Sequence, residues 1–233
     1  MFTPYHHFTN CGRLESTIDS LKESGNVPDD IVKGYRRYHF ALIHKIKCAR
    51  HHLDSLIDLM STTELADALS KSSNFMFLAN MYLDGFFYTC GSAMDILARE
   101  VLTYFAIPLP TQVYFQTAKR LLRSNRPGDA LISRFDDPSW RNDFSMYRNA
   151  VTHERIIAGN FNIEVTIDGD TEAKTLTLPL PDNPRVDVMA RTFRTNPDVL
   201  EYCNLHLKRL LILTNTVYGE INARIITNGN LPL

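Results

Sequence analysis

Three side chains suited to acid/base and phosphate chemistry, Arg148, Asn149 and His153, lie within six consecutive positions of the sequence. On an α-helix Asn149 and His153 share a face, and Arg148 is rotated about 100° from Asn149 around the helix axis. Histidine exchanges protons near neutral pH, and the planar arginine guanidinium matches two phosphate oxygens. The spacing alone also fits a surface helix on which Arg148 forms a salt bridge and Asn149 hydrogen-bonds His153, so this alternative stays open.

A second set of polar side chains recurs every three or four residues in an otherwise apolar stretch. Its members are Asp84, Tyr88, Ser92, Asp95 and Arg99. Such a stripe is usually a solvated helix face, but the opposite stripe of this stretch is strongly apolar. We therefore predict that Ser92 and Asp95 support Arg148 or His153, and that Tyr88 can stack on a base.

Two clusters of basic residues offer local positive charge for a nucleic acid. The first contains Arg36, Arg37, Lys45, Lys47 and Arg50, and the second contains Lys119, Arg120, Arg123 and Arg126. Either cluster also fits a surface that is merely kept soluble. If RNA binds, the second cluster is the preferred phosphate track, because it lies in and beside a predicted loop.

Four potential metal ligands, His44, Cys48, His51 and His52, occur in one predicted helix. Cys48 lies four residues from both His44 and His52, so one such pair could share an ion, but His44 and His51 are two turns apart. We predict no metal and no other cofactor. A metal-dependent helical-bundle enzyme that uses these histidines is kept as an alternative.

The composition is that of an ordinary folded domain. The chain has 233 residues, of which 44% are hydrophobic and 22% charged, so we predict one domain over residues 1–233. A formal net charge of −1 gives no overall basic field, and any RNA contact must be local. Asp84 interrupts the most apolar run, and the four cysteines are scattered, which together favour a cytoplasmic protein with reduced thiols.

The hydrophobic periodicity predicts a mainly α-helical bundle of four or five helices with one inserted β-hairpin. A period of two between about 161 and 180, with Asp168-Gly169-Asp170 as the turn, indicates the hairpin. Helices are predicted over 28–60, 64–71, 75–105, 113–122, from 137 through 151, and over 200–221, with a loop and a short helical turn over 181–197.

The segment Tyr147-Arg148-Asn149-Ala150-Val151-Thr152-His153 resembles the signature of the HEPN family (higher eukaryotes and prokaryotes nucleotide-binding), in which a polar residue follows an arginine and a histidine comes a few positions later. Four residues separate Arg148 from His153. The segment 86–97 is similar to an earlier long helix of that family. The resemblance covers most of the chain outside the hairpin, and its specific part is the signature.

The resemblance implies a helical homodimer in which two signatures meet in one cleft that cuts RNA without metal. By position, His153 would be the general acid or base, Arg148 would stabilise the phosphorane charge, and Asn149 would orient the scissile phosphate. We therefore predict a metal-independent endoribonuclease of the toxin or defence type, with an antitoxin or regulatory protein as a further partner. The first alternative is a non-catalytic HEPN module that binds a nucleotide, RNA or a protein.

The predicted homodimer has a second basis in the helix itself. Asn149 and His153 point away from a core stripe of Phe144, Tyr147 and Val151. Ile156 and Ile157 follow on roughly the same outward side, which predicts an apolar face for a second copy of the chain.

Overall fold

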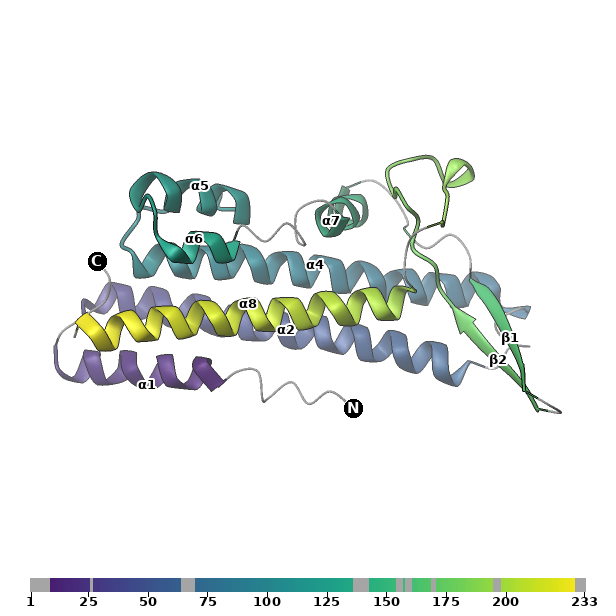
Figure 1. The fold of residues 1–233 in the computed structure, drawn as a ribbon, viewed down its shortest axis with the longest axis horizontal. Coiled ribbons are helices and arrows are strands. Elements are labelled where there is room, and N and C mark those ends of the chain that lie inside the picture. Colours follow the sequence, from purple (N-terminus) through teal and green to yellow (C-terminus); the bar gives the residue numbers. More distant parts are fainter. Residues whose placement is uncertain are drawn as a thin grey trace. The chain divides into compact units, whose positions relative to one another are not determined.

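The chain is mainly α-helical and carries one antiparallel hairpin in its described part, as the periodicity predicts (Figure 1). The computed structural model describes residues 9–25, 27–63, 70–135, 143–153, 157, 161–168, 171–194 and 198–228. The α-helices are α1 (Thr9–Glu23), α2 (Asp29–Thr62), α4 (Ser72–Tyr104), α5 (Phe115–Asn125), α6 (Ala130–Phe135), α7 (Asp143–His153) and α8 (Val199–Asn228). The remaining elements are β1 (Asn162–Asp168), β2 (Thr171–Thr177) and the 3-10 turn η3 (Val188–Ala190).

The long helices α2, α4 and α8 and the shorter α5 lie where the apolar periodicity predicts them. The helices α1 and α6 were not predicted. The described buried residues of α1 are only Leu14 and Ile18, and α6 has six residues, so neither helix repeats its apolar positions often enough to produce a period. The predicted short helix over 64–71 falls largely outside the described residues, as does the predicted helix start at 137–140.

The buried stripe of α2 differs from the prediction in its first turns. Apolar residues at helical spacing would predict Tyr38 as a core residue, but Tyr38 is only half-buried and the adjacent His39, with 3% of its surface exposed, lies in the core. A helix can place a histidine there because buried polar groups are tolerated when they are hydrogen-bonded. The partners of His39 come from α1 and α8.

The predicted hairpin pairs β1 with β2 antiparallel, with Asn162 opposite Thr177 and Asp168 opposite Thr171. The two turn residues 169–170 lie outside the described residues. Just after β2, Leu178 and Leu180 are fully buried. The alternation of apolar and polar residues that predicts the strands therefore continues beyond the paired residues, and its last two leucines are part of the core.

The helices divide between two compact units, each with its own core. The first unit comprises residues 1–45, 92–138 and 208–233, and the second comprises residues 46–91 and 139–207. The long helices α2, α4 and α8 contribute a segment to each unit.

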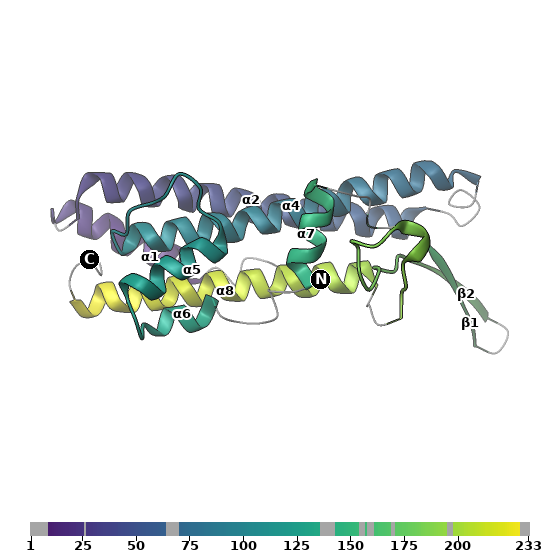
Figure 2. The ribbon, with the colours of Figure 1, turned by 90° about the horizontal axis from the view of Figure 1, so that it is seen from above.

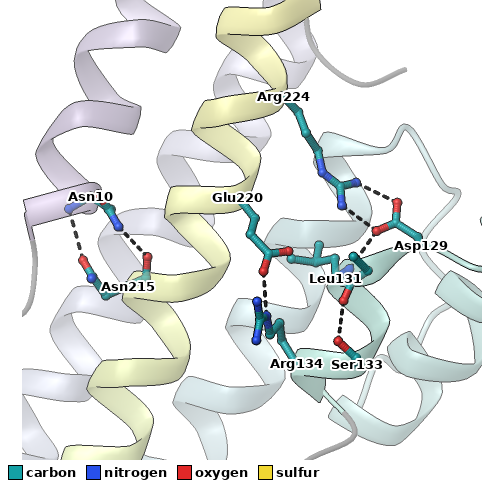
Figure 3. Close-up of polar contacts among 9 residues, drawn as sticks. Asn10, Asp129, Leu131, Ser133, Arg134, Asn215, Glu220 and Arg224 are labelled. Carbon is teal, nitrogen blue, oxygen red and sulfur yellow. Dashed lines mark hydrogen bonds and ion pairs between the residues drawn. The ribbon is translucent and has the colours of Figure 1, made fainter.

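In the first unit, α1 and α6 are both fastened to α8 by paired polar side chains (Figure 3). The backbone and side-chain amides of Asn10 bind the side-chain and backbone oxygens of Asn215 at 3.1 and 3.0 Å. At the start of α6, both carboxylate oxygens of Asp129 accept hydrogen bonds of 2.6 Å from Arg224. The same Asp129 accepts the backbone N–H of Leu131 at 2.8 Å and so caps α6.

In the second unit, α7 runs across α4 (Figure 2). Phe87 of α4 lies within 5.5 Å of the ring of Tyr147 and 5.4 Å of the ring of Phe144, measured between centroids. Tyr202 of α8 adds a third aromatic contact to Phe87. Aromatic clusters of this kind bury large areas with a defined geometry, and they fix how α7 is rotated about its axis.

No helix in the described part of the chain is both long enough and apolar enough to cross a membrane.

Replacing Asp129 by alanine should destabilise the fold, because it removes a helix cap and two charge-assisted hydrogen bonds together. We expect the free energy of unfolding in urea near neutral pH to fall by about 2 to 3 kcal/mol. Hydrogen bonds from Arg224 hold the pKa of the Asp129 carboxyl below its usual range. The stabilisation is therefore present above the unfolded pKa of 3.8 and is lost as the pH falls through the lower folded value.

Arg134→Ala is the matched control, because Arg134 pairs with Glu220 at the same helix interface but is 52% exposed. Its loss should cost no more than roughly 1 kcal/mol. Equal costs for the two variants would contradict the special role of Asp129.

Candidate functional site

The core stripe of α7 consists of Phe144, Tyr147 and Ala150, which are 2%, 1% and 0% exposed. The predicted third member, Val151, is only half-buried. In Figure 2, α7 runs across α4 instead of lying along it. Arg148 and Asn149 are half-buried at the edge of this stripe.

Tyr147 anchors the helix just before the candidate site. Its ring stacks on Phe87 with an interplanar angle of 28°, and Tyr202 meets it edge-on with centroids 5.3 Å apart. Its hydroxyl donates a hydrogen bond of 2.6 Å to the carbonyl oxygen of Pro181. Because Arg148 follows Tyr147 directly, the anchored ring also sets the direction in which the arginine leaves the helix.

The side chain of Arg148 lies against the backbone of α4 at Gly91. A Cβ atom on Gly91 would come within 2.9 Å of Nε and 3.0 Å of Cγ of Arg148, closer than side chains normally approach. The Nε atom is shielded from solvent. Glycine at position 91 thus provides the space that the arginine stem occupies.

Gly91 lies on the polar stripe of α4, because it is seven residues from Asp84 and nearly two full turns return it to the same face. On this face Tyr88 is 50% exposed and Asp84 is half-buried. Gly91 was not among the predicted site residues. The available signal was a glycine in the middle of a long helix, where it costs about 1 kcal/mol relative to alanine and often marks a close approach.

The predicted supporting residues Ser92 and Asp95 belong to the first unit, whereas Arg148 belongs to the second. Asp95 has a structural partner: its Oδ1 accepts a 2.7 Å hydrogen bond from the backbone N–H of Phe115, the first residue of α5. The contacts of Ser92 and Asp95 with the signature residues stay predictions. The same holds for base stacking on Tyr88.

His153 is the last residue of α7, and its side chain lies outside the described part of the structure. The helical backbone from Asn149 to His153 is described, so the two residues are one helical turn apart on the same face, as the spacing predicts. Whether their side chains meet stays a prediction.

The expectation of an apolar face after the signature is wrong for Ile157. Its side chain is fully buried in the second unit, and its carbonyl oxygen accepts a 2.8 Å hydrogen bond from Nη1 of the buried Arg191. The helix ends at His153, so Ile157 does not continue the outward face of α7. Ile156 lies outside the described residues.

The four residues of the predicted phosphate track, Lys119, Arg120, Arg123 and Arg126, differ in their exposure to solvent. Lys119 is only 5% exposed, so its ammonium group is not offered to solvent as the prediction requires. Arg126 is half-buried, and its guanidinium lies over the ring of Phe105 at 5.4 Å. Arg120 and Arg123 are exposed. Of the four predicted residues, Arg120 and Arg123 on α5 therefore remain as candidates for binding phosphate.

The described residues do not support the alternative of a metal site formed by His44, Cys48, His51 and His52 on α2. Among the described residues no group of three histidine, cysteine, aspartate or glutamate side chains could hold an ion. His44 is exposed, whereas the ring of His52 lies so close to Gly85 of α4 that a Cβ there would overlap it. Burial and the neighbouring His51 lower the pKa of His52.

Asp84, on the same face as Gly91, carries a buried carboxylate oxygen with no hydrogen-bond partner among the described residues. Burial raises the pKa of its carboxyl from 3.8 to about 6. A carboxyl with a raised folded pKa opposes folding once it ionises, so the stability of the protein should decline as the pH rises from 3.8 through about 6.

Asp84→Asn should therefore stabilise the protein at about pH 7.5 by roughly 1 kcal/mol, after allowance for the solvent that reaches this half-buried group. The gain should shrink as the pH approaches 4, which urea unfolding at both pH values will measure. Asp58→Asn, at an exposed aspartate of α2, is the control and should change stability much less. A gain that is the same at both pH values would rule out the burial of charge as its cause.

No protein-family model matches this sequence, and neither the curated proteins nor the solved structures include a match.

Proposed function

We propose that this chain acts on RNA as a metal-independent endoribonuclease of the HEPN type, with Arg148, Asn149 and His153 as its catalytic residues. The observation that carries the proposal is the position of Arg148, whose stem lies against Gly91. Such packing reduces the conformational freedom that an arginine loses when it binds phosphate, so the charged group is prepared in advance for its ligand.

The chemistry needs a proton carrier and a cation, and the signature provides both. His153 removes the proton from the 2′-hydroxyl or donates one to the leaving 5′-oxygen, while the bond from the 2′-oxygen to phosphorus forms and the bond to the 5′-oxygen breaks. Arg148 stabilises the negative charge of the phosphorane, and Asn149 orients the phosphate. RNA supplies its own nucleophile, so this route requires no metal ion.

The proposal also includes the partners that the resemblance implies. The active form would be a cytoplasmic homodimer whose two signatures share one cleft, with an antitoxin or regulatory protein controlling it. Because Ile157 is buried, the proposed dimer face rests on Asn149 and His153. Exposed Arg120 and Arg123 on α5 are the proposed contacts to more distant phosphates.

The purified protein should cleave single-stranded RNA in the presence of EDTA and leave 2′,3′-cyclic phosphate ends, whereas DNA should resist because it lacks the nucleophile. His153→Ala should reduce the rate by about 10² to 10⁴. Arg148→Lys retains the charge but loses the planar fork, so its rate should also fall. Gel electrophoresis of end-labelled RNA will measure the rates, and light scattering of the same samples will show whether the active species is a dimer.

Loss of wild-type cleavage in EDTA, or full cleavage by His153→Ala, would show that the proposed mechanism is wrong. If the protein binds RNA or a nucleotide but never cuts RNA, the non-catalytic HEPN alternative replaces it.

Gly91→Ala tests the role of the arginine position separately from its charge. The new methyl group should push the Arg148 stem from its place on α4, and we expect RNA cleavage or binding to fall by roughly ten-fold or more while the helices remain folded. Circular dichroism and urea unfolding will verify the fold.

Gly12→Ala is the matched control, because a Cβ on Gly12 of α1 would meet nothing within 4 Å. Alanine should be neutral or slightly stabilising there, since it favours a helix more than glycine does. Equal activity losses in the two variants would contradict a specific effect on Arg148.

A further inference from the structure

The core of the first unit contains a connected set of titratable side chains that the proposed RNA chemistry does not use. Glu100 of α4 is fully buried and accepts hydrogen bonds from the hydroxyls of Tyr218, at 2.7 Å, and Tyr104, at 3.3 Å. His39 of α2 lies beside them, with Nδ1 at 2.9 Å from the Tyr218 hydroxyl and 3.6 Å from Glu100 Oε1. The other ring nitrogen of His39, Nε2, lies 3.3 Å from Sγ of Cys11.

The hydrogen bonds assign the tautomer of His39. The single hydroxyl proton of Tyr218 is donated to Glu100, so the Tyr218 oxygen can only accept at the His39 Nδ1 position, and Nδ1 carries a proton. In the neutral ring Nε2 is then the acceptor, and it faces the Cys11 thiol. The arrangement is a nucleophile, a base and an acid that orients the base.

The electrostatics of the cluster favour a proton on His39. Burial lowers the pKa of the imidazole, but the hydrogen bonds to Cys11 and Glu100 and the nearby negative charge outweigh burial and raise it to about 10. Among the described residues, the titratable groups around the ring are Cys11 from α1, Tyr35 from α2, Glu100 and Tyr104 from α4, and Tyr218 from α8. An imidazolium beside a cysteine is a recognised way to activate the thiol.

Cys11 is held at this position by the polar contacts of α1 with α8. The neighbouring Asn10 binds Asn215 through two hydrogen bonds (Figure 3), and Thr17 Oγ1 donates a 2.7 Å hydrogen bond to Asn222. Gly219 allows the close approach, because a Cβ there would lie 2.6 Å from Asn10 Nδ2. Unlike the fully buried members of the cluster, Cys11 is half-buried, so part of the residue faces solvent.

We propose that Cys11, His39 and Glu100 form a reactive-thiol site at which Cys11 exchanges with the disulfide of a small thiol. Cys11 gives its proton to the neutral His39 ring, which forms a thiolate–imidazolium pair, and the thiolate sulfur attacks one sulfur of the disulfide. A new disulfide bond to Cys11 forms as the old one breaks, and the departing thiolate takes the proton back from His39. Acyl transfer would also need donors for an oxyanion, whereas disulfide exchange requires only the thiolate and a proton acceptor.

Cys48 provides an internal control within the same chain, because it is also half-buried and outside any disulfide, while Cys90 and Cys203 are buried. The reduced full-length protein is incubated with glutathione disulfide, and mass spectrometry of its peptides follows each cysteine over time. We expect Cys11 to form the mixed disulfide roughly ten-fold faster than Cys48 or more. A Cys11 rate equal to or below that of Cys48 overturns the proposal.

Variants of the cluster test the mechanism. His39→Gln should bring Cys11 close to the rate of Cys48, and Glu100→Gln, which retains the side-chain shape, should slow Cys11 several-fold without changing Cys48. Glu100 acts through His39 as a positioning residue, so Glu100→Gln should also move the pH profile of Cys11 alkylation by iodoacetamide to higher pH. A purely structural role would leave that profile in place.

If His39→Gln does not fold, Tyr218→Phe replaces it, because this variant retains the buried ring and removes only the hydroxyl between His39 and Glu100. Its Cys11 rate should also fall. Unchanged Cys11 rates and pH profiles in folded Glu100→Gln and Tyr218→Phe overturn the proposed activation.

Discussion

The burial of Glu100 is the constraint around which the first unit is organised. An ionised carboxylate removed from water costs several kcal/mol unless hydrogen bonds and a partner charge compensate for it. Burial raises the pKa of Glu100, and two tyrosine hydroxyls and the His39 ring act against that rise. Because these groups come from α2, α4 and α8, the carboxylate requires a particular face of each helix to point inward. The rotation of the helices in this unit is thereby specified by polar groups as well as by apolar area.

In the second unit the corresponding constraint is steric. Two glycines of α4 allow neighbouring side chains to reach its backbone, with His52 of α2 at Gly85 and Arg148 of α7 at Gly91. A Cβ atom would overlap the ring of His52 at Gly85 and would lie 2.9 Å from Arg148 at Gly91, so the neighbouring side chain would have to move. The aromatic contacts of Phe87 and Tyr147 hold α7 in the position where the arginine meets this gap.

The two units therefore offer different chemistry. The second unit presents an arginine on a packed helix, followed by the histidine of the signature, which suits a phosphodiester. In the first unit, the thiol of Cys11, the imidazole of His39 and the carboxylate of Glu100 lie next to one another in that order. This order is suited to moving a proton from the sulfur to the imidazole. Neither set needs a metal ion to form its nucleophile. Each can be disabled by changes that leave the residues of the other untouched, so the two proposed activities can be tested separately in one protein.

The helical class, the long helices, the hairpin and the signature could be predicted from the sequence, because hydrophobic periodicity and residue spacing are local properties that need no knowledge of tertiary contacts. The sequence predicted the helical turn from Asn149 to His153 for the same reason. It could not show that His39 and not Tyr38 lies in the core, since that choice depends on Glu100 and Tyr218, which are distant in sequence.

Which side chains contact one another depends on how the helices of each unit pack. Arg148 reaches Gly91 because α7 crosses α4 at that residue, and Ile157 turns inward because the helix stops at His153 and Arg191 binds the following backbone. Lys119 is buried although its sequence neighbours Arg120 and Arg123 are exposed. No sequence motif predicts the contact between Cys11 and His39, because it forms only when the short helix α1 packs on α8 through Asn10. Such pairings depend on the packing of whole helices, which no local pattern encodes.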